Sequence, residues 1–415
     1  MATCTAVGIA GNAKLPGNTT TMFSNIDKNK VRVLYSFPHR LGAGRICWTA
    51  WQQVIGLHSA GAKVTAVVGS AQRTPPEDVE LRTTMAIGRV RIPFRLLGAR
   101  RMSLLHDWLT ARWLKANAGE IDIVHAWPLG SLHTIRAARK LGIPVVLERP
   151  NTHTGFAYQV VEEECELIDF KLPDGYEHKF DATNLAHEEM EYEEGDYLLC
   201  PSEFVARTFI DKGFSREKLL RHQYGYDKSA IWPGEQTGSP DKGLVMIYVG
   251  LCTPRKGLHY ALEAWRASDA SKTGRFMICG DFVPGYREKL GELLDQPGVE
   301  VLGHRNDIPE LMRQSDLFIL SSVEEGSALV TYEARGSGCV LVVSDASGAV
   351  CTHLENAMVH ASRDVATLTA HMDQLNYDRS LLGRLRAASI GELDRLTWNA
   401  AGERLLEVYH EALGR

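Results

Sequence analysis

Short apolar runs of strand length recur along the chain, and most lead through a polar or glycine-containing loop into a stretch with helical spacing. The runs begin at residues 31, 63, 121, 145, 197, 219, 245, 276, 299, 316 and 339. Strands that alternate with helices are typical of parallel sheets covered by helices. The pattern therefore predicts an α/β protein.

A segment of linker composition separates the two sets of strands. Residues 228–243 are rich in Pro, Gly and polar residues, which favours an irregular connection. Residues 31–227 and 244–396 then form two β/α domains, and residues 1–30 are expected to be a flexible N-terminal extension. The length of 415 residues exceeds one ordinary core and agrees with two domains.

One segment, residues 321–334, carries the strongest candidate chemistry. A helix is expected to start near Gly326, with free backbone N–H groups at the carboxyl end of a strand, where phosphate binds readily. Glu325 precedes this helix, and Glu333 lies eight positions on, about 12 Å away at 1.5 Å per residue. They are too far apart for one acid–base pair, but they can hold hydroxyl groups at two parts of a long ligand. A nucleotide sugar fits, with Glu325 on the sugar and Glu333 on the ribose, and a solvated helix face is the alternative.

Two loops at other strand ends add to this site. Arg255 and Lys256 follow the run that begins at residue 245, where two cations can neutralise a diphosphate and the charge that develops as a glycosidic bond breaks. The loop 38–45 contains Gly42 and Gly44, which let backbone approach a ligand, although a simple turn would look the same. It lacks the third glycine of the dinucleotide fingerprint.

These residues resemble the signature of retaining glycosyltransferase family 4, the glycosyl transferases of group 1. The Glu325 and Glu333 pair, the Gly-Cys-Val sequence after it and the segment 248–257 carry the resemblance. It runs from about residue 31 to the C-terminus and is stronger in the second half. It implies a GT-B fold, with two Rossmann-like domains facing each other across a cleft and residues 397–415 packing back on the first domain.

The resemblance also implies a reaction. The C-terminal domain would bind a nucleotide diphospho-sugar, with a UDP-sugar favoured, and the N-terminal domain a hydroxyl acceptor, either a glycan, a lipid-linked saccharide or a small molecule. Transfer would retain the anomeric configuration. The catalytic candidates are Glu325, Lys256, Arg255 and His125. The donor-binding candidates are Glu333, Gly326, Ser327, Ala328, Leu329, Gly250, His304, Arg305 and Gly44.

The second half departs from the family pattern at three positions. Leu251 occupies the place of the usual arginine, so Arg255 would substitute for it from four residues on. Ser327 and Ala328 stand where Phe and Gly are common. Both are small enough to keep backbone close to a phosphate.

The first half supplies weaker candidates, at the ends of two predicted strands. His125 could orient the transferred sugar, but Trp127 stands at the family's second histidine position, and a core histidine is equally compatible. Glu148, Arg149 and His153 are candidates on the acceptor side. A structural salt bridge between Glu148 and Arg149 would explain those two as well.

Two charged segments lie in the first half. Residues 89–115 hold seven basic residues and one acidic residue among leucines and tryptophans, which fits either peripheral contact with an anionic membrane or a core-packed helix with a solvated basic face. Residues 162–196 are strongly acidic. Solvated helix faces explain most of these acids, and an acidic wall for a cationic acceptor is the alternative.

Composition narrows the function classes. The net charge of −5 argues against a nucleic-acid partner, and no apolar run is long enough to cross a bilayer. The absence of a signal-peptide pattern and of C-x-x-C pairs among the eight cysteines leads us to expect a cytoplasmic protein with reduced thiols, peripheral at most to the inner membrane face. No D-x-D occurs, so we expect no metal and no other cofactor.

Two other functions remain compatible with the sequence. A nucleotide-sugar epimerase of the same architecture would convert the donor without any acceptor. A non-catalytic protein would bind the donor without turnover. A nicotinamide dehydrogenase fits least, because neither strand–glycine loop has the fingerprint.

Overall fold

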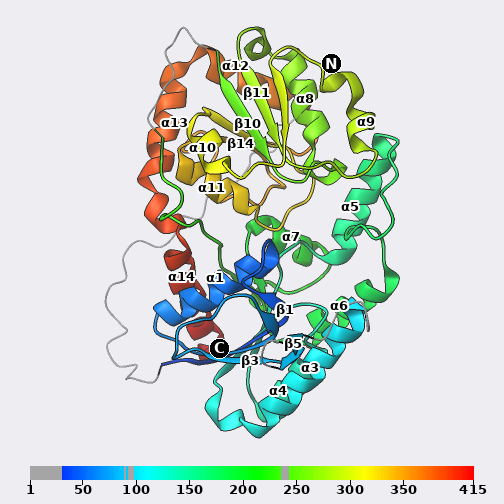
Figure 1. Ribbon diagram of the computed structural model, residues 1–415, viewed down its shortest axis with the longest axis vertical. Coiled ribbons are helices and arrows are strands. Elements are labelled where there is room, and N and C mark those ends of the chain that lie inside the picture. Colours follow the sequence, from blue (N-terminus) through cyan, green and yellow to red (C-terminus); the bar gives the residue numbers. More distant parts are fainter. Residues whose placement is uncertain (1–29, 88–89, 92–97, 235–242) are drawn as a thin grey trace, which may run out of the picture. The chain divides into compact units, whose positions relative to one another are not determined.

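A computed structural model describes residues 30–87, 90–91, 98–234 and 243–415 (Figure 1). The predicted extension, apart from Lys30, lies outside the described residues, as do residues 235–242 of the predicted linker and part of the basic segment 89–115. Residues 31–415 form one compact unit that contains two parallel sheets.

The first sheet has seven parallel strands in the order β3-β2-β1-β6-β7-β8-β9. They are β3 (Glu80–Thr83), β2 (Lys63–Ala71), β1 (Arg32–Leu41), β6 (Ile123–Ala126), β7 (Val145–Glu148), β8 (Tyr197–Cys200) and β9 (Leu219–Arg221). The helices of this part are α1 (Ile46–Ser59), α3 (Ala99–Ala116), α4 (Leu132–Leu141), α5 (Thr154–Leu167), α6 (Ala182–Glu194) and α7 (Glu203–Asp211). A short antiparallel ribbon joins β4 (Ala86–Ile87) to β5 (Val90–Arg91).

The second sheet has six parallel strands in the order β12-β11-β10-β13-β14-β15. They are β12 (Val299–Gly303), β11 (Arg275–Cys279), β10 (Val245–Val249), β13 (Leu317–Leu320), β14 (Val340–Ser344) and β15 (Ala357–His360). The helices are α8 (Leu258–Ala267), α9 (Tyr286–Leu290), α10 (Ile308–Arg313), α11 (Leu329–Ser337), α12 (Val365–Tyr377) and α13 (Arg379–Gly391). The sequence pattern predicted every strand of this sheet except β15, whose run of apolar residues is short.

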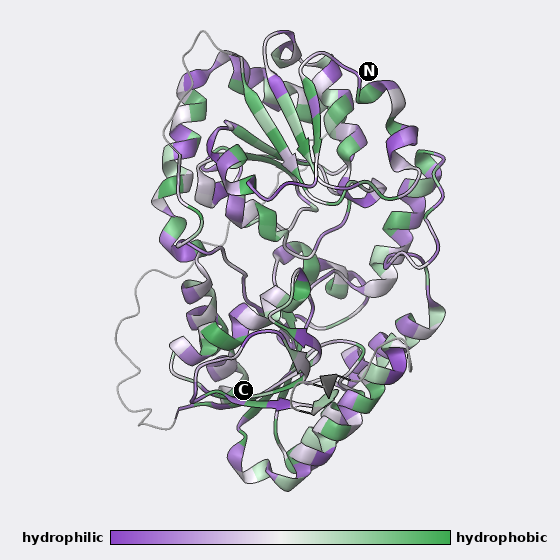
Figure 2. Ribbon diagram, in the orientation of Figure 1, coloured by the Kyte–Doolittle hydropathy of each residue, from purple (hydrophilic) through white to green (hydrophobic). Residues whose placement is uncertain are grey.

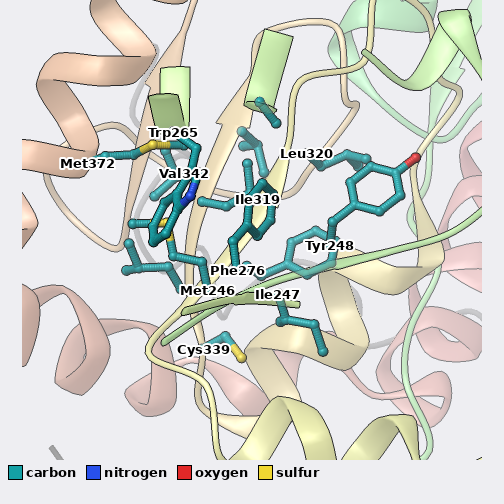
Figure 3. Close-up of a cluster of buried hydrophobic side chains, with 14 of the residues drawn as sticks. Met246, Ile247, Tyr248, Trp265, Phe276, Ile319, Leu320, Cys339, Val342 and Met372 are labelled. Carbon is teal, nitrogen blue, oxygen red and sulfur yellow. The ribbon is translucent and has the colours of Figure 1, made fainter. Parts of the chain in front are cut away.

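The second core shows why the apolar runs form strands. In the second core, Met246, Phe276 and Ile319 from three strands lie on the face of the sheet that Trp265 of α8 covers, and all four side chains are fully buried (Figure 3). Ile247, equally buried, points to the opposite face. A strand covered by helices on both faces needs apolar residues at successive positions, which gives continuous runs instead of alternation. The same strands are coloured hydrophobic in Figure 2, whereas the surrounding helices carry both kinds of residue. The seven cysteines in the described part are free thiols, as expected.

The last helix, α14 (Trp398–Gly414), packs along α1 of the first sheet's domain, and its first turn also joins a buried cluster with Tyr332 of α11. It crosses α1 where Gly56 meets Gly402, and a Cβ added at Gly402 would lie 2.4 Å from the Gly56 carbonyl carbon. Val408 and Tyr409 of α14 are buried in the first core. The GT-B architecture is therefore confirmed, including its returning C-terminal helix. Among the described helices, none combines the length and apolar content that crossing a bilayer requires.

Candidate functional site

A cleft of about 580 Å³ lies at the carboxyl ends of the second sheet's strands. Loops after β10, β11, β12 and β13 line it, together with the start of α11. From the first sheet's domain, the start of α1, the loop after β7 and the segment around Tyr176 complete the lining. Ten predicted site residues line this cleft, namely Glu325, Lys256, Arg255, Glu333, Ser327, Ala328, Leu329, Gly250, His304 and Arg305.

Arg255 and Lys256 lie in a 3₁₀ turn (Pro254–Lys256) that follows β10. Gly257 ends this turn with φ +63°, and a Cβ there would lie 1.9 Å from the carbonyl oxygen of Ser321. A glycine is therefore required for the turn to pack on the end of β13. This tight contact brings both cations next to the loop that carries Glu325.

Arg255 is held by a carboxylate that the sequence analysis did not single out. Its Nη1 donates to the Glu324 carboxylate at 2.9 Å and to the Glu324 carbonyl oxygen at 2.8 Å. Burial lowers the pKa of Arg255, but Glu325 and Glu324 outweigh this effect and raise it, so the guanidinium stays charged. Its Nε and the Thr253 hydroxyl are buried at the wall of the cleft, where the Tyr176 hydroxyl lies close enough to hydrogen-bond to both residues.

Glu325 is an ionised carboxylate between two cations. It forms an ion pair with Lys256 and lies 3.3 Å from Arg255 Nη1. Burial would raise the pKa of Glu325, but Arg255 and Lys256 reverse the effect and hold it below its ordinary value. A ligand that takes both cations must therefore loosen this ion pair.

Glu333 lies on the second turn of α11 and, unlike Glu325, is not paired with a cation in the described part of the chain. It lines the cleft, and its carboxyl group has no hydrogen-bond or ion-pair partner among the described residues. Burial alone raises its pKa to about 7. An unpartnered carboxyl group in a polar cleft is ready to accept hydrogen bonds from ligand hydroxyls.

The helix that carries Glu333 starts later than predicted. It begins at Leu329 and not near Gly326, because Ala328 has extended backbone (φ −65°, ψ 109°). Gly326 does not line the cleft. A Cβ there would lie 1.7 Å from the Pro150 carbonyl oxygen, so this glycine serves a close contact with the loop after β7. The Ser327 hydroxyl does line the cleft and bonds to Tyr332 and to the Gly348 carbonyl oxygen.

The remaining donor-side predictions lie on the rim. His304 and Arg305 are exposed there, and Arg305 is paired with Asp307 at 2.8 Å. Gly44 does not line the cleft, but its neighbour Arg45 does, with φ +58° and a side chain that has no hydrogen-bond or ion-pair partner among the described residues. Arg45 was missed because a surface arginine in a glycine loop has no distinctive pattern.

His125 and Glu148 lie together, but inside the first domain and not in the cleft. Both are fully buried, and His125 Nε2 is 3.4 Å from the Glu148 carboxylate. Glu148 also accepts from Tyr224 at 2.7 Å and from Gln53 at 3.0 Å, and His222 Nε2 lies 3.1 Å away. Burial would raise the pKa of Glu148, but His222 and His125 hold it far below its usual range. The reading of His125 as a core histidine fits this placement.

Arg149 and His153 also lie away from the cleft. Arg149 stacks over the Tyr192 ring at 4.3 Å and has Glu188 at 3.7 Å, so the proposed salt bridge with Glu148 does not form. His153 caps α5 by accepting from the Gly155 N–H, and burial followed by the Arg149 charge lowers its pKa to about 4. It lines a separate depression of about 550 Å³ beside α6.

Within the described ranges, no group of three or more His, Cys, Asp or Glu side chains is placed to bind a metal ion. The absence of metal from the reaction remains an expectation from the sequence.

Comparisons with known families give matches in both halves. Residues 243–378 match the model described as glycosyl transferases group 1, and residues 48–227 match the model described as glycosyltransferase family 4. Together these two ranges include the residues that line the second-sheet side of the cleft and most of the first domain.

Curated relatives are transferases. The UDP-Gal:α-D-GlcNAc-diphosphoundecaprenol α-1,3-galactosyltransferase of Escherichia coli is 25% identical over 283 residues, 61% of this chain and 65% of the relative. The N,N′-diacetylbacillosaminyl-diphospho-undecaprenol α-1,3-N-acetylgalactosaminyltransferase of Campylobacter jejuni is 30% identical over 126 residues, 29% of this chain and 33% of the relative. The matched region thus spans less than two thirds of either relative.

Solved structures agree on the fold. Sucrose-phosphate synthase of Thermosynechococcus elongatus has a TM-score of 0.65 at 15% identity, and covers 93% of this chain and 100% of its own. HepE of Anabaena, in complex with UDP and glucose, has a TM-score of 0.60 at 16% identity, and covers 92% and 100%.

Proposed function

The chain belongs to the glycosyl transferases of group 1, and from this premise we propose that it moves a hexosyl group from a UDP-sugar to an acceptor hydroxyl. Transfer retains the anomeric configuration and uses no divalent metal. The observation that carries the proposal is the convergence of Arg255, Lys256, Glu325 and Glu333 on one cleft.

Each of these side chains has a role in the proposed reaction. Arg255 and Lys256 bind the diphosphate and stabilise the charge on it as the glycosidic bond breaks, which is where electrostatic catalysis contributes most. Glu333, unpartnered and partly buried, accepts hydrogen bonds from the ribose hydroxyls. Glu325 turns from Lys256 toward the hydroxyls of the transferred sugar.

The proposed order of events follows from the ion pairs. In the structure Glu325 forms an ion pair with Lys256. A diphosphate brings its own negative charge to the two cations and releases Glu325 to the sugar. Two fixed cations then do the work that a carboxylate-bound divalent metal does elsewhere.

Relatives suggest the acceptor class. The relatives from E. coli and C. jejuni are named for acceptors linked to undecaprenyl diphosphate, and we propose a polyprenyl-diphosphate-linked saccharide here as well. An exposed pair of a basic and an aromatic side chain on α3 supports this choice, because Trp108 is 44% exposed and lies 4.8 Å beneath the Arg112 guanidinium. Basic and aromatic side chains together favour an anionic membrane surface.

The donor proposal is tested by thermal-shift measurements with UDP-, GDP- and ADP-sugars on wild type and Glu333→Gln. We expect UDP-sugars to raise the Tm of the wild type most, and the shift to shrink in the variant. No shift with any nucleotide sugar would refute the donor site. Transfer in EDTA and the anomeric NMR signal of the product test metal independence and retention.

Membrane contact is tested separately, by sedimentation with vesicles that contain anionic lipid. The double variant Trp108→Ala/Arg112→Ala should lose most of the vesicle-bound fraction, whereas Lys272→Met, on the other domain, should not. Equal sedimentation of the three proteins would refute a contact through α3.

A further inference from the structure

Glu324 is a fully buried carboxylate at the junction of three segments. It follows β13, immediately before Glu325. Buried carboxylates are rare unless their oxygens are paired, so the partners of this group define what it does. They come from both sheets' domains.

One oxygen of Glu324 serves the donor side of the cleft. Oε2 accepts from Arg255 Nη1 at 2.9 Å, and the Glu324 carbonyl oxygen accepts from the same nitrogen. His178 Nε2 lies 3.6 Å from Oε2, on the segment between α5 and α6. Glu324 therefore fixes one arm of the guanidinium that faces the diphosphate position.

The other oxygen serves the first domain. Oε1 accepts from the Thr152 hydroxyl at 2.6 Å and from the Thr152 backbone N–H at 3.3 Å. Thr152 is fully buried in the loop between β7 and α5. Next to it, Gly326 touches Pro150, and the Ser202 hydroxyl donates to the Gly326 carbonyl oxygen. These contacts hold the loop that contains Glu324 against the loop that contains Thr152.

We infer that Glu324 is a positioning residue that couples the orientation of Arg255 to the contact between the two domains. When the Thr152 loop is in place, two hydrogen bonds orient the Glu324 carboxylate, which in turn orients Arg255 toward the diphosphate. When this contact opens, the carboxylate loses both bonds and its fixed orientation. Charge stabilisation at the leaving group is therefore complete only in the closed arrangement, which limits breakdown of the donor by water.

The inference rests on the proposed function, and a set of matched variants tests it. Thr152→Val removes the hydroxyl at constant shape, and Thr152→Ser restores it. Thr134→Val is the control, because Thr134 is another buried threonine whose hydroxyl donates to a buried carboxylate, Asp107, at 2.7 Å, away from the cleft. Glu324→Gln removes the charge directly. The measurement is release of UDP from UDP-galactose, resolved into kcat and KM.

We expect Glu324→Gln to lower kcat about tenfold to a hundredfold while KM changes less than about twofold, because a misplaced catalytic group affects the transition state most. Thr152→Val should lower kcat about threefold to tenfold, and Thr152→Ser should recover it. The double variant of Glu324→Gln and Thr152→Val should be no slower than Glu324→Gln alone, since both act through one group. Thr134→Val should match wild type.

Specific outcomes overturn the inference. If Thr152→Val behaves like Thr134→Val, or if the two changes at positions 152 and 324 multiply, Glu324 is not coupled to the first domain. Should Glu324→Gln fail to fold, the threonine series alone still decides. A wild type that releases no UDP would instead refute the proposed donor, and with it this inference. That result differs from an active wild type whose Glu324 and Thr152 variants behave normally, which refutes only the inference.

Discussion

The two sheets present polar side chains at the same structural position and use them differently. At the carboxyl edge of the second sheet, Arg255, Lys256 and Glu325 line the cleft. At the carboxyl edge of the first sheet, His125 and Glu148 are fully buried and line no part of it. The edge of a parallel sheet is where ligands bind, but a polar residue there can equally become part of a core.

The covering elements explain the difference. Tyr409 of α14 hydrogen-bonds to His125 Nδ1 at 2.6 Å, and Gln53 of α1 donates to Glu148. Tyr224, which follows β9 and lines the cleft, also donates a hydrogen bond to Glu148. At the carboxyl edge of the second sheet, the charged side chains instead line the cleft.

The largest expected effect tests the carboxyl edge of the first sheet. Glu148→Ala leaves two histidines and Tyr224 without their shared acceptor, and removing one partner from a buried charged network costs about 3–5 kcal/mol. Urea unfolding followed by circular dichroism measures this loss. The matched change Glu333→Ala should not destabilise the fold, because Glu333 has no partner to lose. A loss below about 1 kcal/mol for Glu148→Ala would mean that the network is not structural.

The second-largest expected effect tests the carboxyl edge of the second sheet. Lys256→Met should lower kcat about a hundredfold to a thousandfold, because it removes a cation from the developing charge on the leaving group. Its Tm should stay near that of the wild type. An exposed lysine provides the control, and Lys272→Met should leave kcat unchanged. If Lys256→Met instead unfolds the protein at constant activity per folded molecule, the second edge is structural like the first.

A third prediction uses the pKa of Glu333, about 7 in the folded chain against about 4.3 in an unfolded one. Because the folded state holds this proton more tightly, its contribution to stability is full below about pH 4 and lost as the pH rises through 7. The free energy of unfolding should fall by about 4 kcal/mol across that window. Urea titrations at several pH values measure it, with Glu333→Gln as the reference. Parallel pH curves for the two proteins would contradict the prediction.

The smallest effect concerns the part of the first domain that does reach the cleft. Arg45→Ala should weaken UDP binding about threefold to fivefold, since an exposed cation contributes up to about 1 kcal/mol. Calorimetric titration at two salt concentrations checks this, because the difference should shrink as salt rises. Arg112→Ala, on α3, is the control. If Arg45→Ala and the wild type bind UDP with equal affinity, only the carboxyl edge of the second sheet contributes to anion binding.

Local patterns predicted which residues of the second sheet's domain line the cleft. The spacing of Glu325 and Glu333 and the adjacent Arg255 and Lys256 lie in short continuous segments, so sequence alone brings them to one edge. The start of α11 was misplaced by about one turn, because contacts with Pro150 and Ser347 hold residues 326–328 out of the helix.

Long-range contacts explain the rest. The partner of His125 is 284 positions away, and Thr152 is 172 positions from Glu324. No periodicity relates such pairs, so the sequence could not decide between the cleft and the core for His125, and it gave no reason to single out Glu324 beside Glu325. Arg255 shows the difference between local and long-range information, because the sequence predicted its location but not the carboxylate that orients it.

The contact between Gly56 and Gly402 has a practical consequence for protein engineering. Leu405, Val408 and Tyr409 belong to the core of the first sheet although they stand at the end of the chain. A chimera that exchanges donor specificity between relatives would therefore need two junctions, one near residue 243 and one near residue 397, with the terminal helix kept from the acceptor-side parent. A single crossover would pair a foreign helix with α1, and any side chain larger than hydrogen at that crossing would force the two helices apart.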